Sequence, residues 1–209
     1  LPLVHKEIAA LVAAGGQAGL AREELAKFAE DAAKMNIAFD KLSAEDAGTM
    51  MANWRTAFKM SQDEVRALSD QINYLSNVTA TDTTSLAEIV TRVGALGDVA
   101  GVSASSILAI GTTMGSVGVG SEVAATGIKN FMLSLVAGEA ATKSQREAFK
   151  KLGLDSEQVS KDMQKDSEKT IIRVLEGVSK LNKAEQATTL QQLLGKESIG
   201  AIAPLLTNL

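Results

Sequence analysis

Residues 99–121 read VAGVSASSILAIGTTMGSVGVGS, and this stretch contains no charged side chain. A helix that spans a membrane needs about 20 mostly apolar residues, whereas glycine, serine and threonine interrupt the apolar residues here. Small side chains of this kind let two helices approach closely. We therefore expect residues 99–138 to form a buried helical pair or a surface for self-association. Insertion of this hairpin into a membrane is kept as the alternative.

Turn and cap residues around this stretch locate the ends of the two helices. Ser103 precedes an apolar run at helical spacing and is a good N-cap, and residues 115–120 are rich in glycine and break that helix. Ser121 opens the next helix, which ends near Gly138. Residues 99–138 thus predict two helices joined by a glycine-rich turn, with Glu122 and Lys129 as their only charged residues.

The same signals continue through the rest of the chain. Its two prolines are Pro2 and Pro204, so no proline interrupts a helix between them. Further helix ends are predicted from a stop at Gly15–Gly16, N-caps at Ser43, Ser61 and Asp155, and a Schellman ending at Gly153–Leu154. The prediction is an all-α fold: a compact multi-helix array of about ten short helices without a sheet, and no heptad pattern long enough for a coiled coil.

Charge divides the chain into two predicted domains. Residues 1–142 form the main helical domain and include the charge-poor pair, and residues 143–209 form a charged C-terminal helical subdomain. The net charge of −4 does not favour direct binding to nucleic acid, which needs a basic surface. No basic segment followed by an apolar segment indicates a signal peptide. Because the first residue is Leu1 rather than Met, we expect the chain to be part of a longer protein.

Residues with catalytic or metal-binding chemistry are few. The chain has no cysteine, and His5 is its one histidine, so thiol chemistry, zinc ligation and a serine triad are not indicated. A phosphate-binding loop needs Gly-Lys-Ser/Thr after an earlier glycine. Residues 115–120 lack the lysine, and residues 195–198 have Glu197 in the Ser/Thr position. We predict no catalytic residue, no cofactor and no metal, and a protein that is not an enzyme.

Several residues are candidates for structural or interaction roles instead. Trp54 lies at helical spacing from Phe58 and is predicted to anchor the core rather than to bind a ligand. Asp70 and Asn73 share a helix face and are expected to cap that helix or contact a neighbouring loop. The remaining candidates are glycines at turns and close helix contacts: Gly101, Gly118, Gly120, Gly127 and Gly195.

Taken in order, several of these segments resemble the core region of phage tail tape measure proteins of the TP901 type. The segments are WRTAF at residues 54–58, LSDQINYLSN at 68–77, the glycine-rich pair at 107–128 and LLGKES at 193–198. Leu194 stands where phenylalanine is usual in the family. The similarity covers roughly residues 20–206, and no single segment is diagnostic by itself.

This resemblance implies a structural function. Proteins of the family are very long, lie extended in the lumen of the tail tube and set tail length. Tail assembly chaperones coat them in the cytoplasm of the bacterial host, tube protein then polymerises around them, and they leave with the DNA at infection. The family also implies transient contact with the host inner membrane. The alternative is a membrane-active or pore-forming helical protein that inserts through residues 99–138.

Overall fold

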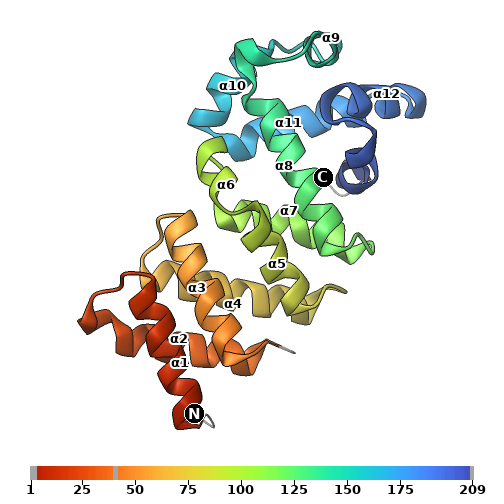
Figure 1. The fold of residues 1–209 in the computed structure, drawn as a ribbon. Helices are drawn as coiled ribbons and strands as arrows, with labels where there is room; N and C mark the ends of the chain where they lie inside the picture. Colours follow the sequence, from red (N-terminus) through yellow and green to blue (C-terminus); the bar gives the residue numbers. More distant parts are fainter. Residues whose placement is uncertain (1–3, 40–41, 208–209) are drawn as a thin grey trace.

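The computed structural model describes residues 4–39 and 42–207, and within them it contains α- and 3-10 helices and no β-strand (Figure 1). The all-α prediction is confirmed. The elements are α1 (His5–Gln17), α2 (Arg22–Ala38), α3 (Ala44–Ala57), α4 (Gln62–Val78), α5 (Thr83–Val93), α6 (Ala95–Ala100), α7 (Ala104–Ser116), α8 (Ser121–Val136), η1 (Gly138–Ala140), α9 (Lys143–Lys151), α10 (Ser156–Lys165), α11 (Ser167–Ser179), α12 (Lys183–Leu194), η2 (Lys196–Ser198), α13 (Ile199–Ile202) and η3 (Ala203–Thr207).

Most helices begin and end where their capping residues predict. The Ser61 hydroxyl accepts a hydrogen bond from the backbone N–H of Glu64, and the Glu64 carboxylate accepts one from the N–H of Ser61. The Ser103 hydroxyl caps α7 by accepting a hydrogen bond from the backbone N–H of Ser106. These side chains satisfy N–H groups that have no partner inside the first turn of a helix. Gly153 has a φ of 71°, and the N–H of Leu154 donates to the carbonyl of Phe149 at 2.8 Å, as in a Schellman ending.

Two helix boundaries differ from the prediction, and tertiary contacts explain the first. The predicted stop at Gly15–Gly16 is wrong, because α1 continues to Gln17. Gly15 is buried in α1, and a Cβ there would lie 2.9 Å from Cδ1 of Phe28, so this glycine allows α1 to approach α2. The second difference is α6. The glycines at 97 and 101 predict a connection there, but Ala95–Ala100 form a short helix between Gly94 and Gly101, both of which have positive φ.

The helices form two groups that are joined mainly through α5, and α4 of the first group also contacts α7 of the second (Figure 1). Helices α1, α2 and α3 contact one another, and α4 contacts α2 and α3. Helix α5 contacts α3 and α4 on one side and α7 and α8 on the other. Helix α8 in turn contacts α10, α12 and α13. The buried apolar residues of the described parts form one connected core. Helix α8 therefore packs against helices on both sides of residue 142, while the division into two domains there stays a prediction.

The charge-poor pair of helices, α7 and α8, lies inside this array. The two helices contact each other, and both contact α5. Ile107, Leu108 and Met114 of α7 are buried, as are Ile128 and Phe131 of α8. In the described parts of the chain, no helix combines the length and the apolar character needed to cross a bilayer.

Gly127 provides a test of this packing. A Cβ at Gly127 of α8 would lie 2.5 Å from the Cβ of Ala201 in α13, and neither atom belongs to a flexible side chain. We expect Gly127→Ala to lower the free energy of unfolding by about 1–3 kcal/mol, the usual cost of overpacking a core. Urea unfolding followed by circular dichroism measures the change.

Gly16→Ala is the matched control, because Gly16 is also in a helix but no atom lies within 4 Å of the position of its Cβ. Replacing a helical glycine by alanine with no new contact stabilises a protein by about 0.5–1 kcal/mol. Equal stabilisation by the two substitutions would contradict the close contact between α8 and α13.

Candidate functional site

Trp54 and Phe58 link α3 to the helices after α4. Trp54 is fully buried, and its indole N–H donates a hydrogen bond of 2.8 Å to the hydroxyl of Thr91 in α5. Phe58 is half-buried, and its Cε1 would lie 2.9 Å from a Cβ at Gly97 of α6. The enclosed position of Trp54 is that of a core anchor, because no open surface remains on its ring for a ligand.

Asp70 and Asn73 lie on α4 at the edge of the first group of helices. Asp70 is exposed and Asn73 is half-buried, and both line a hollow of about 300 Å³ whose wall includes Phe39. The Asn77 side-chain amide donates to the carbonyl of Asn73 at 2.7 Å, near the end of the helix. This hydrogen bond belongs to the helix itself, and no hydrogen bond or ion pair joins Asp70 or Asn73 to a neighbouring loop among the described residues.

The five candidate glycines are spread over the second group of helices and do not form one site. Gly101 and Gly195 come directly after α6 and α12, and each has a positive φ. Gly118 (φ 87°) and Gly120 (φ −63°) lie in the exposed turn between α7 and α8, where no atom approaches the position of a Cβ. Of the five, Gly127 is the one at a close helix–helix contact.

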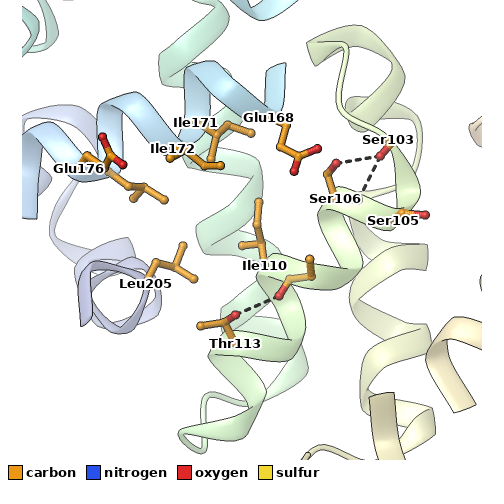
Figure 2. Close-up of a pocket in the computed structure, with 12 residues that line it drawn as sticks. Ser103, Ser105, Ser106, Ile110, Thr113, Glu168, Ile171, Ile172, Glu176 and Leu205 are labelled. Carbon is orange, nitrogen blue, oxygen red and sulfur yellow. Dashed lines mark hydrogen bonds between the residues drawn. The ribbon is translucent and has the colours of Figure 1, made fainter. Parts of the chain in front are cut away.

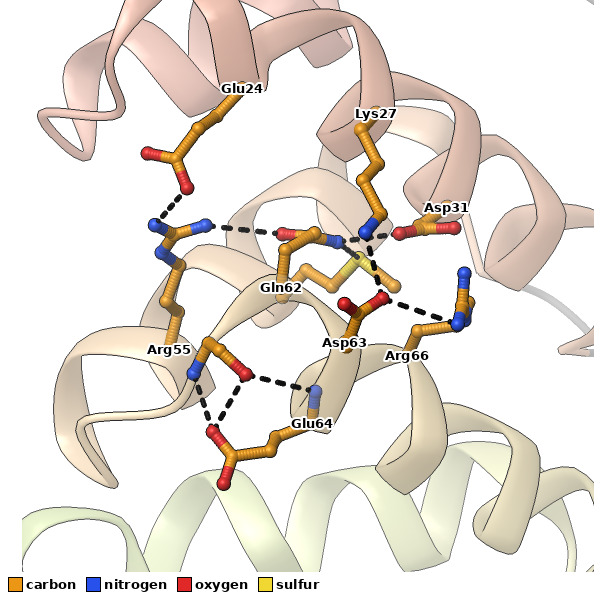
Figure 3. A network of polar contacts seen from close by, with 10 residues as sticks. Glu24, Lys27, Asp31, Arg55, Gln62, Asp63, Glu64 and Arg66 are labelled. Carbon is orange, nitrogen blue, oxygen red and sulfur yellow. Dashed lines mark hydrogen bonds and ion pairs between the residues drawn. The ribbon is translucent and has the colours of Figure 1, made fainter.

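A polar network joins α2, α3 and α4 (Figure 3). The Arg55 guanidinium donates to the carboxylate of Glu24 at 2.6 Å and to the Gln62 side chain at 3.5 Å. The hydrogen bond from Arg55 lowers the pKa of Glu24 below its ordinary value. Gln62 in turn donates at 2.9 Å to Asp31, which is only 3% exposed. The network supplies a donor to a buried carboxylate and holds three helices in register, which is a structural role.

A hollow lies along α7 (Figure 2). It has a volume of about 490 Å³, and α11 forms its other wall with Leu205 of η3 at one side. A second hollow of about 350 Å³ lies between α7 and α4, and the two share Ser105, Ala109 and Thr113 on α7. We call both hollows together the α7 groove. Its floor is the outer face of α7, and its walls are α4 and α11.

The α7 groove has apolar walls and two carboxylates. Ile172 on α11 is 42% exposed and Tyr74 on α4 is 65% exposed. Glu168 and Glu176 lie one helical turn on either side of Ile172, and neither has an ion pair among the described residues. Sequence reasoning did not identify this groove. The described residues also contain no cluster of His, Cys, Asp and Glu that is arranged to hold a metal ion.

Two comparisons with known proteins identify the class of this all-α protein. The model for the family of phage-related minor tail proteins matches residues 2–195, so the chain belongs to this family. The chain is also 37% identical to a probable tape measure protein of Halomonas phage phiHAP-1, over 97% of its own length. These matches confirm the resemblance to phage tail tape measure proteins.

The similarity extends over only part of that relative. The chain spans 24% of the length of the Halomonas phage protein. No solved structure matches the chain. By its family the chain is a phage tail structural protein. Because the chain spans only part of the Halomonas phage protein, the activity of that whole protein can only be proposed for this chain.

Asp31 allows the structural role of the polar network to be tested. Gln62→Met keeps the length of the side chain but removes the donor to the buried carboxylate. We expect a loss of about 1–3 kcal/mol in the free energy of unfolding, the cost of leaving a buried polar group unpaired.

Gln71→Met is the control, because Gln71 is exposed on the same helix and accepts a hydrogen bond from the Ser105 hydroxyl at the surface. Its effect should stay within about 0.5 kcal/mol. Equal losses in urea unfolding would show that Asp31 does not depend on Gln62.

Proposed function

We propose that this chain is a segment of a tape measure protein that sets tail length during tail assembly and is released when the DNA is ejected. The observation that carries the proposal is the similarity to the probable tape measure protein over nearly the whole chain. A helical chain suits a ruler, because each residue of a continuous α-helix adds about 1.5 Å to its length.

Partners and location belong to the same proposal. The segment lies in the lumen of the tail tube, and its partners are the tube protein and the tail assembly chaperones that coat it in the host cytoplasm. Contact with the host inner membrane occurs at ejection. The proposed function is mechanical and needs no catalysis.

An in-frame deletion tests the length-setting function in a phage whose tape measure gene encodes this chain. If the segment is a continuous helix inside the tube, removing its 209 residues shortens the tail by roughly 310 Å. Duplicating the segment lengthens the tail by the same amount. Electron microscopy of negatively stained particles measures both changes.

Other outcomes of the deletion would contradict the proposal. Tails of unchanged length would exclude a role in setting length. A shortening of only roughly 40 Å, the diameter of a compact domain of this size, would contradict an extended segment. Gly16→Ala in the same gene is the control, because it changes the sequence without changing the number of residues, and tail length should stay the same.

A further inference from the structure

The α7 groove is the surface of this chain that is best suited to bind another helix. Its floor carries Ser105, Ala109 and Thr113, one small residue per turn of α7, and Ile110 of the same helix stands at the edge toward α11. A floor of small residues leaves room for the backbone of a second helix along α7. By themselves these residues define only the shape of the groove, and its walls supply the chemistry.

The walls provide apolar contacts on both sides of that floor. Ile172 and half-buried Ile110 lie on the side of α11, with buried Leu175 beneath them, and exposed Tyr74 lies on the side of α4. Figure 2 shows Ile110, Ile172 and Leu205 around one hollow. The apolar face of an amphipathic helix, with anchors at i, i+3, i+4 and i+7, is the usual ligand of such a groove.

Charge determines which amphipathic helix fits. Glu168 and Glu176 are the charged residues among the described lining of both hollows, and neither carboxylate has an ion pair or hydrogen bond among the described residues. They lie eight residues apart on α11, which corresponds to about 12 Å along the helix axis. Lysine or arginine residues about two turns apart on a partner helix would meet both carboxylates.

We propose that the α7 groove binds an amphipathic helix of another protein, whose apolar face is flanked by basic residues about two turns apart. A second copy of this chain does not fit as well. The exposed apolar stripe of α1, which contains Ile8 and Val12, has only Lys6 and His5 as basic neighbours. Elsewhere in the described residues, Lys27 and Lys34 of α2, the helix that carries exposed Ile37, already pair with Asp63 and Glu30.

A synthetic helix serves as the probe. The peptide is alanine-rich and about 18 residues long, with leucines at i, i+3, i+4 and i+7 and two lysines two turns apart beside them. A twin peptide has glutamates in place of the lysines. Fluorescence anisotropy of the labelled peptides with the 209-residue chain measures binding. We expect the lysine peptide to bind at least about tenfold more tightly than its twin, and less tightly as salt is raised.

Variants of the chain locate the binding site. Glu168→Gln together with Glu176→Gln should weaken binding of the lysine peptide by about two- to tenfold, because each exposed ion pair contributes little. Ile172→Glu should weaken it by about tenfold or more. The control is Ile37→Glu, which changes an isoleucine of similar exposure on α2 and should leave binding unchanged. Circular dichroism checks that each variant is folded, and the double Gln variant preserves the size of both side chains.

Four results of the peptide experiments would overturn the proposal. They are the absence of binding by the lysine peptide, equal binding of the two peptides, equal effects of Ile37→Glu and Ile172→Glu, and unchanged binding in the double Gln variant. Sedimentation of the chain without peptide tests whether a second copy of the chain occupies the groove instead. A dimer that Ile172→Glu dissociates would assign the groove to a second copy and would also overturn the proposal. None of these results depends on tail length, so this proposal and the proposed function fail separately.

Discussion

The close packing of α5, α7 and α8 is the contact on which the rest of the structure depends. Helix α5 contacts both groups of helices, and Gly111 lets α7 lie against it, since a Cβ there would be 2.9 Å from Cγ2 of Ile89. Trp54 fixes α3 to the same helix through Thr91. With aromatic residues at only 3% of the sequence, such close contacts between small and aliphatic side chains replace the bulk that rings would supply.

The sequence predicts helix starts better than helix contacts. Ser61 and Ser103 act within a single turn of chain, so their capping role is local and readable. A pair of glycines usually ends a helix, but α1 continues through Gly15. Its close contact with Phe28 is a tertiary interaction that outweighs the cost of roughly 1 kcal/mol for a glycine inside a helix. The candidate residues show the same contrast between local and tertiary features. Burial of Trp54 is predictable from its helical spacing, whereas the α7 groove can be predicted only if it is known that α11 lies beside α7.

The edge of the groove shows what apolar periodicity predicts and what it leaves open. Ile171 shares an i, i+3, i+4, i+7 stripe with Val174, Leu175 and Val178, so helical spacing assigns it to the core, whereas Ile172 lies outside this stripe. In the structure Ile171 is buried and Ile172 is 42% exposed. Because Glu168 and Glu176 share the face of Ile172, the exposed isoleucine lies between two carboxylates that have no ion pair among the described residues. An isolated exposed isoleucine needs no explanation, but one that lines a groove with unpaired charges indicates a surface that another molecule covers.

The compact fold and an extended ruler place different demands on the same sequence. Gly94, Gly101, Gly118, Gly153 and Gly195 all have positive φ and end or separate helices in the compact form. In one continuous helix each of them would adopt a helical conformation at a cost of roughly 1 kcal/mol, and the connected core would be exposed. The compact array is therefore the state that the isolated segment favours. An extended state needs compensation from outside the segment, which contacts with coating chaperones and the wall of the tube would supply in the proposed function.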